Sequence, residues 1–367
     1  MRGFLFKIIF LLSFTVVFSQ AKRPQTPEAP FNYTSDTVHF KNPKANNITF
    51  EGTLTIPKNI KNPPVAILIT GSGPQDRNET VKQFNHSPFL VLADYLSRHG
   101  IAVLRYDDRG VGNSEGDFST GTSYDFATDA EAAFTFLKQR TDIDTSAIGL
   151  IGHSEGGLIA PMVASKNKDV AFVVLLAGPG VDGAEILRSQ AKKVGMLSGV
   201  PQIQLDENDT LSKTIYEVIK TTKNEDSIAA RVTRGLNDYK AKNPMSVLAP
   251  YITPVMIEQQ LKTLKSPWIK AFIRIDPKDY LQETTCPVLA LNGSKDVQVL
   301  ADLNLEGIKA GLEKAQNTDV TIKALEGLNH LFQTAETGMP QEYSKIEETF
   351  SPNALEIISN WILERFH

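Results

Sequence analysis

Short apolar runs, separated by segments with helical spacing, constrain the fold of this 367-residue sequence more than any other feature. Strands of a parallel sheet are buried on both faces, so they are apolar throughout instead of alternating. Runs of this kind that alternate with helices along the chain predict a parallel sheet covered by helices on both faces. The five runs are residues 65–69, 101–105, 148–151, 170–176 and 287–291, with 320–324 as a weaker sixth.

Two departures from this rhythm suggest how the chain is organised. Near the start, residues 37–40 and 48–56 alternate between apolar and polar side chains, which predicts an antiparallel hairpin. Between residues 182 and 267 the strand signals vanish and polar helical stretches dominate, so we expect an inserted helical cap. The two parts of the core are then 37–181 and 268–367, and the predicted helices include 89–99, 123–138, 211–220, 253–264 and 352–366.

The first 21 residues have the three parts of a secretory signal peptide: a charged start, an apolar run, and the small-x-small sequence Ser19-Gln20-Ala21. A membrane anchor is the alternative, but its apolar core would fall short of the roughly 20 residues that span a bilayer. We therefore expect export to the periplasm or the outside, with no stable membrane insertion after cleavage. Residues 22–36, rich in Pro and small polar types, are expected to form a flexible tether.

The charge argues against a protein that binds nucleic acid or a membrane surface, and the cysteine content excludes one that is stabilised by disulfides. The 38 basic and 42 acidic residues give a net charge of −4, and no Lys/Arg-rich run predicts a nucleic-acid or membrane patch. A single cysteine, Cys286, rules out a disulfide within the chain, and its place at the start of an apolar run predicts a buried small side chain.

The strongest catalytic signal is Gly152-His153-Ser154-Glu155-Gly156, a G-x-S-x-G motif. An apolar strand runs directly into it and a small-residue helix follows, which is the context that confirms a nucleophile elbow. Glycine suits the positions two residues before and two residues after the serine, because a Cβ there would clash across a sharp turn. The alternative is a glycine-rich turn with an incidental serine. We identify Ser154 as the candidate nucleophile of an α/β-hydrolase fold.

A nucleophilic serine needs a histidine base, and the base needs an acid that holds its tautomer. In this fold the order along the chain is Ser, then Asp or Glu, then His. Only His330 and the terminal His367 follow Ser154, and His330 comes just after the weak sixth strand. Asp296, which closes a strand and a glycine-containing turn, is the predicted acid. Its competitor Asp302 falls inside the following helix.

The oxyanion donors are predicted to be two backbone N–H groups, those of Ser72 and Glu155. Glycines on both sides of Ser72, in the loop after the first apolar run, let the backbone approach a substrate. His153 is expected to pack or to fix a loop, because adjacent side chains on a sharp turn point apart. The loop after the first apolar run also contains Gln75, Asp76 and Arg77, which are expected either to brace that loop or to contact substrate.

Residues 105–116 contain glycines that suggest phosphate binding, but they lack the Gly-Lys-Ser/Thr ending of a P-loop. Asp107, Asp108 and Arg109 are therefore interpreted as charges that brace a loop. No His or Cys cluster has the spacing of metal ligands, so neither a metal nor a cofactor is expected.

Together these motifs resemble secreted bacterial α/β-hydrolases of the carboxylesterase type, related to the serine-aminopeptidase-like (S33-type) and prolyl-oligopeptidase-like hydrolases. The resemblance covers nearly all of residues 37–367, with Thr70 standing where many relatives have histidine. It implies Ser154, Asp296 and His330 as the triad and a helical cap over the pocket. The matching segments are 71–77, 106–114, 152–157, 267–277, 292–296 and 327–330.

The resulting hypothesis is a serine hydrolase that cleaves a small-molecule carboxylic ester through an acyl-enzyme. A peptidase or aminopeptidase with the same triad is one alternative. A non-catalytic binding protein of the same fold is the other, because fold alone does not fix function.

Overall fold

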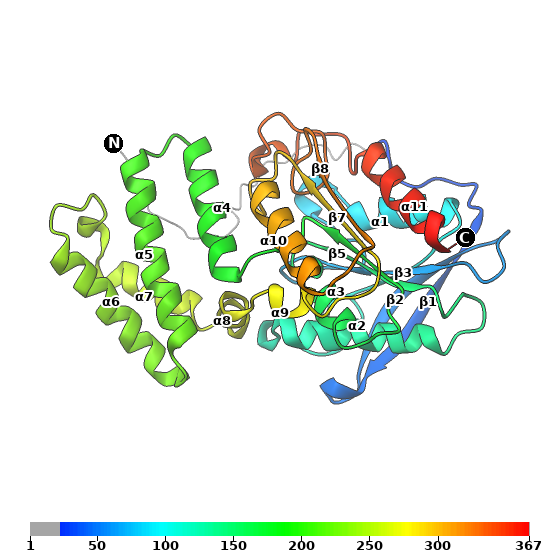
Figure 1. Cartoon of the computed structure of the whole chain (residues 1–367), viewed down its shortest axis with the longest axis horizontal. Helices are drawn as coiled ribbons and strands as arrows, with labels where there is room; N and C mark the ends of the chain where they lie inside the picture. The colour runs from blue at the N-terminus through cyan, green and yellow to red at the C-terminus, as the bar shows by residue number, and fades with distance from the viewer. Residues whose placement is uncertain (1–22, 367) are drawn as a thin grey trace.

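The computed structural model describes residues 23–366, so the predicted signal peptide and His367 lie outside the described residues. Its centre is one eight-stranded sheet with the order β1-β2-β4-β3-β5-β6-β7-β8 (Figure 1). The first three strands in this order pair antiparallel, and from β4 to β8 every pairing is parallel. The strands are β1 Tyr33–Asn42, β2 Ile48–Pro57, β3 Val65–Ile69, β4 Ala102–Tyr106, β5 Ile148–His153, β6 Phe172–Leu176, β7 Val288–Gly293 and β8 Val320–Leu325.

Helices cover both faces of the sheet, and every residue of its central strands β3 to β7 is buried. Val65 and Ile67 face the layer of α2, α3 and α10, whereas Ala66 and Leu68 face the layer of α1 and α11. Successive side chains of a strand point to opposite faces, so each strand contributes to two apolar cores. The five helices are α1 Pro88–Arg98, α2 Ser123–Lys138, α3 Gly156–Ala164, α10 Ala301–Lys314 and α11 Pro352–Phe366.

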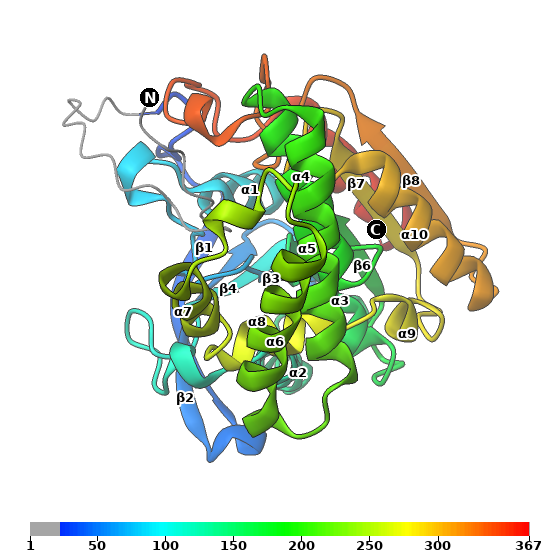
Figure 2. The same ribbon diagram turned by 90° about the vertical axis from the view of Figure 1, so that its left-hand side faces the viewer.

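Between β6 and β7 the described chain is helical and builds a separate layer beside the sheet, which faces the viewer in Figure 2. We call α4–α8, residues 183–274, the helical insertion. It has its own apolar cluster, which also includes Leu158 and Met162 of α3. Its helices are α4 Gly183–Leu197, α5 Gln202–Thr221, α6 Ile228–Lys242, α7 Pro254–Thr263 and α8 Pro267–Arg274, and the short α9 Lys278–Leu281 follows.

The far end of the insertion lies beyond the boundary expected at residue 267. Helix α8 packs on α4: a Cβ at Gly183 would lie 1.9 Å from the carbonyl oxygen of Phe272. Phe272, Ile273 and Ile275 belong to the insertion's apolar cluster. Pro267 therefore begins another helix of the insertion, since proline is favoured in a first helical turn, and it does not mark a return to the core.

The stretch expected to be a flexible tether is also different in the structure. Strand β1 begins at Tyr33, whose side chain is buried and donates a hydrogen bond of 2.6 Å to Asp94. Arg23 is buried too, and its guanidinium donates to the carbonyl oxygen of Phe84 at 2.9 and 3.0 Å. The polar composition of this stretch concealed two anchoring side chains. Among the residues that the structure describes, no helix has both the length and the apolarity needed to cross a bilayer.

Candidate active site

The chain turns sharply between β5 and α3, and Ser154 lies at the turn with a φ of 52°. A non-glycine residue with positive φ is strained, and such strain is common at functional sites. The Ser154 N–H holds the turn by donating to the carbonyl oxygen of Leu176 at 2.8 Å. A Cβ at Gly152 would lie 2.0 Å from the carbonyl oxygen of Gly156, so the turn requires glycine there.

Three side chains predicted from the sequence lie in hydrogen-bond contact at this turn. His330 Nε2 lies 3.1 Å from Ser154 Oγ, and His330 Nδ1 lies 2.7 Å from Asp296 Oδ2. The residues follow β5, β7 and β8, whose carboxyl ends share one edge of the sheet. The arrangement has the hydroxyl, imidazole and carboxylate in the order that activates a serine nucleophile.

The Asp296 carboxylate is held rigidly in the turn after β7. Its Oδ1 accepts the N–H groups of Gln298 at 2.7 Å and Val299 at 2.9 Å, which leaves Oδ2 for His330. The Asp296 side chain is fully buried. Asp302, the competitor considered from the sequence, is exposed in the first turn of α10.

The two predicted oxyanion donors belong to residues near Ser154 in the chain or in space: Glu155 follows it directly, and Ser72 follows Gly71. Gly71, next to Ser72, approaches the nucleophile so closely that a Cβ on it would lie 3.2 Å from the Ser154 Cβ. Within the described part of the chain, the N–H groups of Ser72 and Glu155 donate to no protein acceptor. Both N–H groups are therefore free for an oxygen atom of a substrate.

The side chain of Glu155 has a second role, which the sequence did not reveal. Its Oε1 accepts hydrogen bonds from Ser123 Oγ at 2.5 Å and from Trp268 Nε1 at 2.7 Å, and Ser72 also donates to this carboxylate. Burial raises the pKa of Glu155, while these three donors oppose the rise. Glu155 thus connects the start of α2, helix α8 of the insertion and the loop after β3, which carries the predicted donor Ser72 and which we call the oxyanion loop.

His153 fixes two loops, in agreement with its expected structural role. Its Nδ1 lies 2.8 Å from Glu79 Oε1, and its Nε2 lies 2.9 Å from the carbonyl oxygen of His330. Glu79 Oε1 also accepts the Gly71 N–H at 2.8 Å. Glu79 belongs to no motif in the sequence, so its place beside the nucleophile became visible through the fold.

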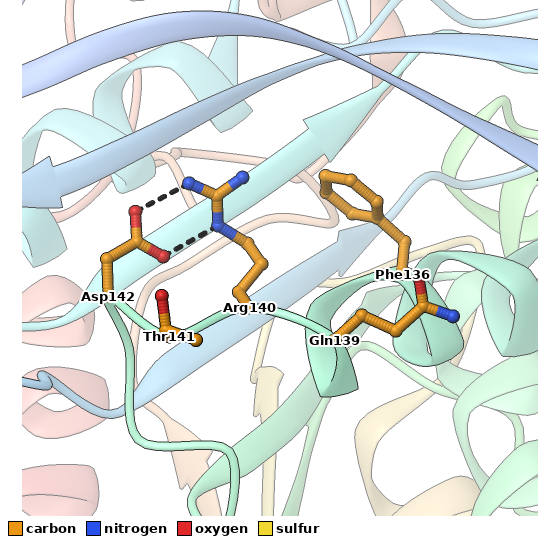
Figure 3. A pocket seen from close by; sticks show the side chains of 5 residues that line it. All are labelled: Phe136, Gln139, Arg140, Thr141 and Asp142. Carbon is orange, nitrogen blue, oxygen red and sulfur yellow. Dashed lines mark hydrogen bonds and ion pairs between the residues drawn. The ribbon is translucent and has the colours of Figure 1, made fainter.

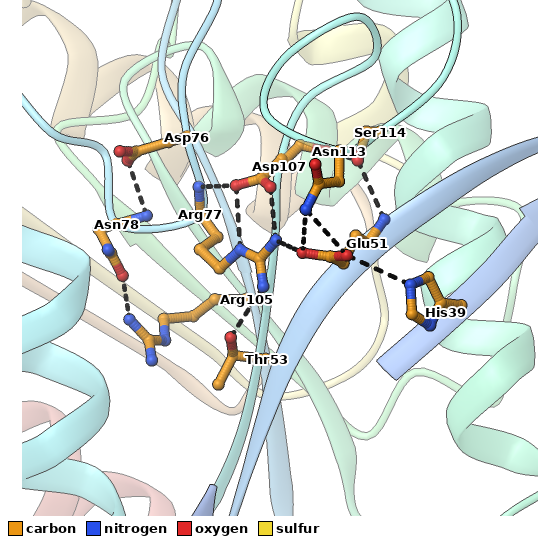
Figure 4. A network of polar contacts seen from close by, with 10 residues as sticks. All are labelled: His39, Glu51, Thr53, Asp76, Arg77, Asn78, Arg105, Asp107, Asn113 and Ser114. Atoms are coloured by element: carbon orange, nitrogen blue, oxygen red, sulfur yellow. Dashed lines mark hydrogen bonds and ion pairs between the residues drawn. The ribbon is translucent and has the colours of Figure 1, made fainter. Parts of the chain in front are cut away.

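The loop after β3 is braced by the charged network in Figure 4. Arg77 donates to both oxygens of Asp107, at 3.0 and 2.5 Å, and to Glu51 at 2.6 Å. Asp108 accepts the Thr70 hydroxyl and the Gln75 N–H, both at 2.9 Å. These contacts match the bracing role expected for Asp107 and Asp108, and they place Arg77 among the bracing residues.

A surface hollow of about 400 Å³ lies far from this chemistry. It is lined by Phe136, Arg140 and Asp142, together with Gln139 and Thr141 (Figure 3). These residues end α2 and precede β5, whereas Ser154 follows β5. The hollow is therefore at the opposite edge of the sheet from the three contacting side chains.

Comparison with known proteins places this site in a family. The family model described as Serine aminopeptidase, S33, matches residues 85–336, which is more than half of the chain. Esterase EstD of Thermotoga maritima is 25% identical over 316 residues, or 85% of this chain. The chain spans 65% of the length of EstD.

Solved structures show the same architecture. The Pyrococcus furiosus esterase PF2001 is 14% identical, with a TM-score of 0.53 and coverage of 96% of this chain and 100% of that chain. The α/β hydrolase GrgF from Penicillium sp. sh18 is 17% identical, with a TM-score of 0.53 and coverage of 91% and 99%. At these identities the likeness concerns the fold, and it confirms the predicted α/β-hydrolase fold.

Proposed function

The chain belongs to the Serine aminopeptidase, S33, family of α/β-hydrolases, and on that premise we propose that it hydrolyses carboxylic esters through Ser154. One observation carries the proposal: His330 lies between Ser154 Oγ at 3.1 Å and Asp296 Oδ2 at 2.7 Å. The similarity to esterase EstD supports an ester as the bond that is cut.

In the proposed reaction, His330 Nε2 takes the hydroxyl proton while Ser154 Oγ attacks the ester carbonyl carbon. The carbonyl oxygen becomes an oxyanion, which the N–H groups of Ser72 and Glu155 stabilise by hydrogen bonds. The alcohol leaves with the proton from His330, and the acyl group stays on Ser154. Water, deprotonated by the same imidazole, then releases the acid and restores the serine.

An aminopeptidase is the second candidate, because the matching family model carries that description. Recognition of a free amino terminus needs a carboxylate that is open to the substrate's ammonium group. Glu155, next to the nucleophile, is only 2% exposed and accepts from three protein donors. This arrangement favours an ester without an amino group. An ester and an anilide of the same acyl group, assayed side by side, separate the two functions.

The test of the nucleophile is Ser154→Ala, with Ser198→Ala at the exposed end of α4 as the matched control. Removal of a triad serine costs about 10⁶-fold in kcat in a well-studied serine protease. We expect a loss of that order on short-chain p-nitrophenyl esters, together with loss of labelling by an organophosphonate. The control keeps both properties. Ester turnover by Ser154→Ala at the rate of the unaltered enzyme contradicts the proposal.

A further inference from the structure

Both ring nitrogens of His153 face hydrogen-bond acceptors. Nδ1 lies 2.8 Å from a carboxylate oxygen of Glu79, and Nε2 lies 2.9 Å from the carbonyl oxygen of His330. A neutral imidazole has one N–H and one unprotonated nitrogen. It can donate to one of these acceptors, but the lone pair of its other nitrogen would face the second acceptor and be repelled by it. The imidazolium, with two N–H groups, satisfies both.

The partner of His153 is held at a conformational cost. Glu79 has a φ of 54°, is 5% exposed, and has an Oε2 without a hydrogen-bond partner in the described part of the chain. A buried carboxylate of this kind requires a nearby positive charge. Strain kept at a buried charge beside a nucleophile points to a functional role.

The contacts of this pair connect two loops with the turn at the end of β5. Glu79 Oε1 accepts the Gly71 N–H at 2.8 Å in the loop after β3, and His153 itself ends β5. The carbonyl oxygen of His330 belongs to the loop after β8. One charged pair therefore holds the backbone next to each reacting group. Glu79 binds Gly71, which precedes Ser72, while His153 precedes Ser154 and contacts the backbone of His330.

We propose that His153 is a permanently protonated positioning residue, which Glu79 holds so that the oxyanion loop and the His330 loop keep their places around Ser154. The inference rests on the proposed function, because it assigns the loops their catalytic roles. His153 is not a second base, since both of its nitrogens are engaged away from the Ser154 hydroxyl.

The electrostatic surroundings agree with a charged ring. Burial by itself lowers the pKa of His153, but the Glu79 carboxylate, its hydrogen bond and the His330 carbonyl oxygen raise it above the usual value. Asp296 adds a further negative charge nearby. His86, on the loop before α1, has a pKa lowered first by burial and next by the charge of Arg23, and the charge on His153 adds a smaller further lowering.

The first test needs no variant. Nitrogen NMR of the ¹⁵N-histidine-labelled mature enzyme distinguishes an imidazolium from a neutral ring, and a His153→Gln sample identifies the signal by its absence. We expect both nitrogens of His153 to be protonated at pH 8. A neutral ring at that pH overturns the proposal, whatever the outcome of the Ser154 experiment.

The second test removes the negative charge of Glu79 but keeps the size and shape of its side chain. Glu79→Gln should let His153 lose its proton at pH 8 and lower kcat about 100-fold with little change in KM, because loops misplaced by about 1 Å weaken transition-state contacts. Glu131→Gln, at a surface pair with Lys44, is the matched control. The double variant Glu79→Gln/His153→Gln should cost no more than either single change.

Unchanged kcat in Glu79→Gln contradicts the positioning role. If that variant does not fold, the NMR spectrum of the unaltered enzyme still decides the charge of His153. Activity that survives Ser154→Ala refutes the proposed function instead, and it leaves the protonation result untouched.

Discussion

Several acidic and basic side chains of the core lie inside the protein, whereas those of the helical insertion lie at or near its surface. Arg109 and Asp129 are buried against each other at 2.8 Å, while Lys192 and Asp206 of the insertion form an exposed pair at 3.1 Å. Among the described residues of α4–α8, no acidic or basic side chain is buried. The insertion instead exposes large apolar side chains: Met196, Leu197, Ile203, Met245, Val247, Tyr251 and Val255.

This difference shows which region holds the chain around Ser154 in a fixed arrangement. A buried charge is costly unless its partners are in place, so each buried pair of the core allows few arrangements of the chain around it. Surface pairs contribute little and constrain little. The core therefore fixes the geometry around the three contacting side chains, whereas the charged pairs of the insertion constrain its shape little.

The largest expected effect comes from breaking one buried pair. Arg109→Met leaves the Asp129 carboxylate buried without its guanidinium, and we expect the free energy of unfolding to fall by about 3–5 kcal/mol. Urea unfolding followed by tryptophan fluorescence measures the change. The matched variant Lys192→Met in the insertion should leave the unfolding midpoint where it was. Equal effects of the two changes would remove the distinction between the regions.

Acid should act on the core through a buried histidine. Burial, and next the charge of Arg23, lower the pKa of His86 to about 4, against a usual value of about 6.5. Between these values the unfolded chain binds a proton that the folded chain does not, so stability is lost as the pH falls through this window. The loss reaches about 3 kcal/mol at pH 4.

His86→Gln should reduce this loss, and His99→Gln, at an exposed position at the opposite end of α1, should not. The measurement is the urea midpoint of each variant from pH 7 to pH 4. An identical acid slope in the enzyme and in His86→Gln would show that other groups control acid unfolding.

The smallest effect concerns the contact between the two regions. Trp268→Phe keeps an aromatic ring on α8 but removes the N–H that donates to buried Glu155 at 2.7 Å. A hydrogen bond to a charged group contributes about 2 kcal/mol, so unfolding should become easier by that amount and ester turnover should fall.

Trp361→Phe is the control, because Trp361 in α11 donates to the neutral hydroxyl of Thr321 at 3.1 Å. It should cost about 1 kcal/mol and leave turnover unchanged. The chain has two tryptophans, so each variant also leaves a single fluorophore, in the core or in the insertion. Equal turnover in the two variants would mean that the insertion does not influence the site through Glu155.

Local patterns predicted the core well. Residues 65–69 and 123–138 are apolar or amphipathic over their whole length, and they form β3 and α2 with the same bounds. The patterns failed where an anchor is a single side chain: Arg23 and Tyr33 fix a stretch whose composition is that of a linker.

The residues of the site also divide into those that local sequence patterns predict and those that only the fold brings together. Ser154 and Asp296 could be identified because each follows an apolar strand at a glycine-containing turn, and the order of the residues along the chain then indicated His330. Glu79 and Trp268 could not, because their importance depends on which loops the sheet brings together. Glu79 meets His153 across 74 residues, and Trp268 meets Glu155 across 113.

The position of the insertion has an evolutionary consequence. Strands β6 and β7 are parallel neighbours, so a long connection between them must exist in any case, and the insertion occupies that connection. The closure entropy of a connection grows slowly, by about 0.6 kcal/mol for each doubling of length. A change in the length of this connection should therefore cost the sheet little stability, which makes it a place where relatives could differ while the edge that carries Ser154, Asp296 and His330 keeps its form.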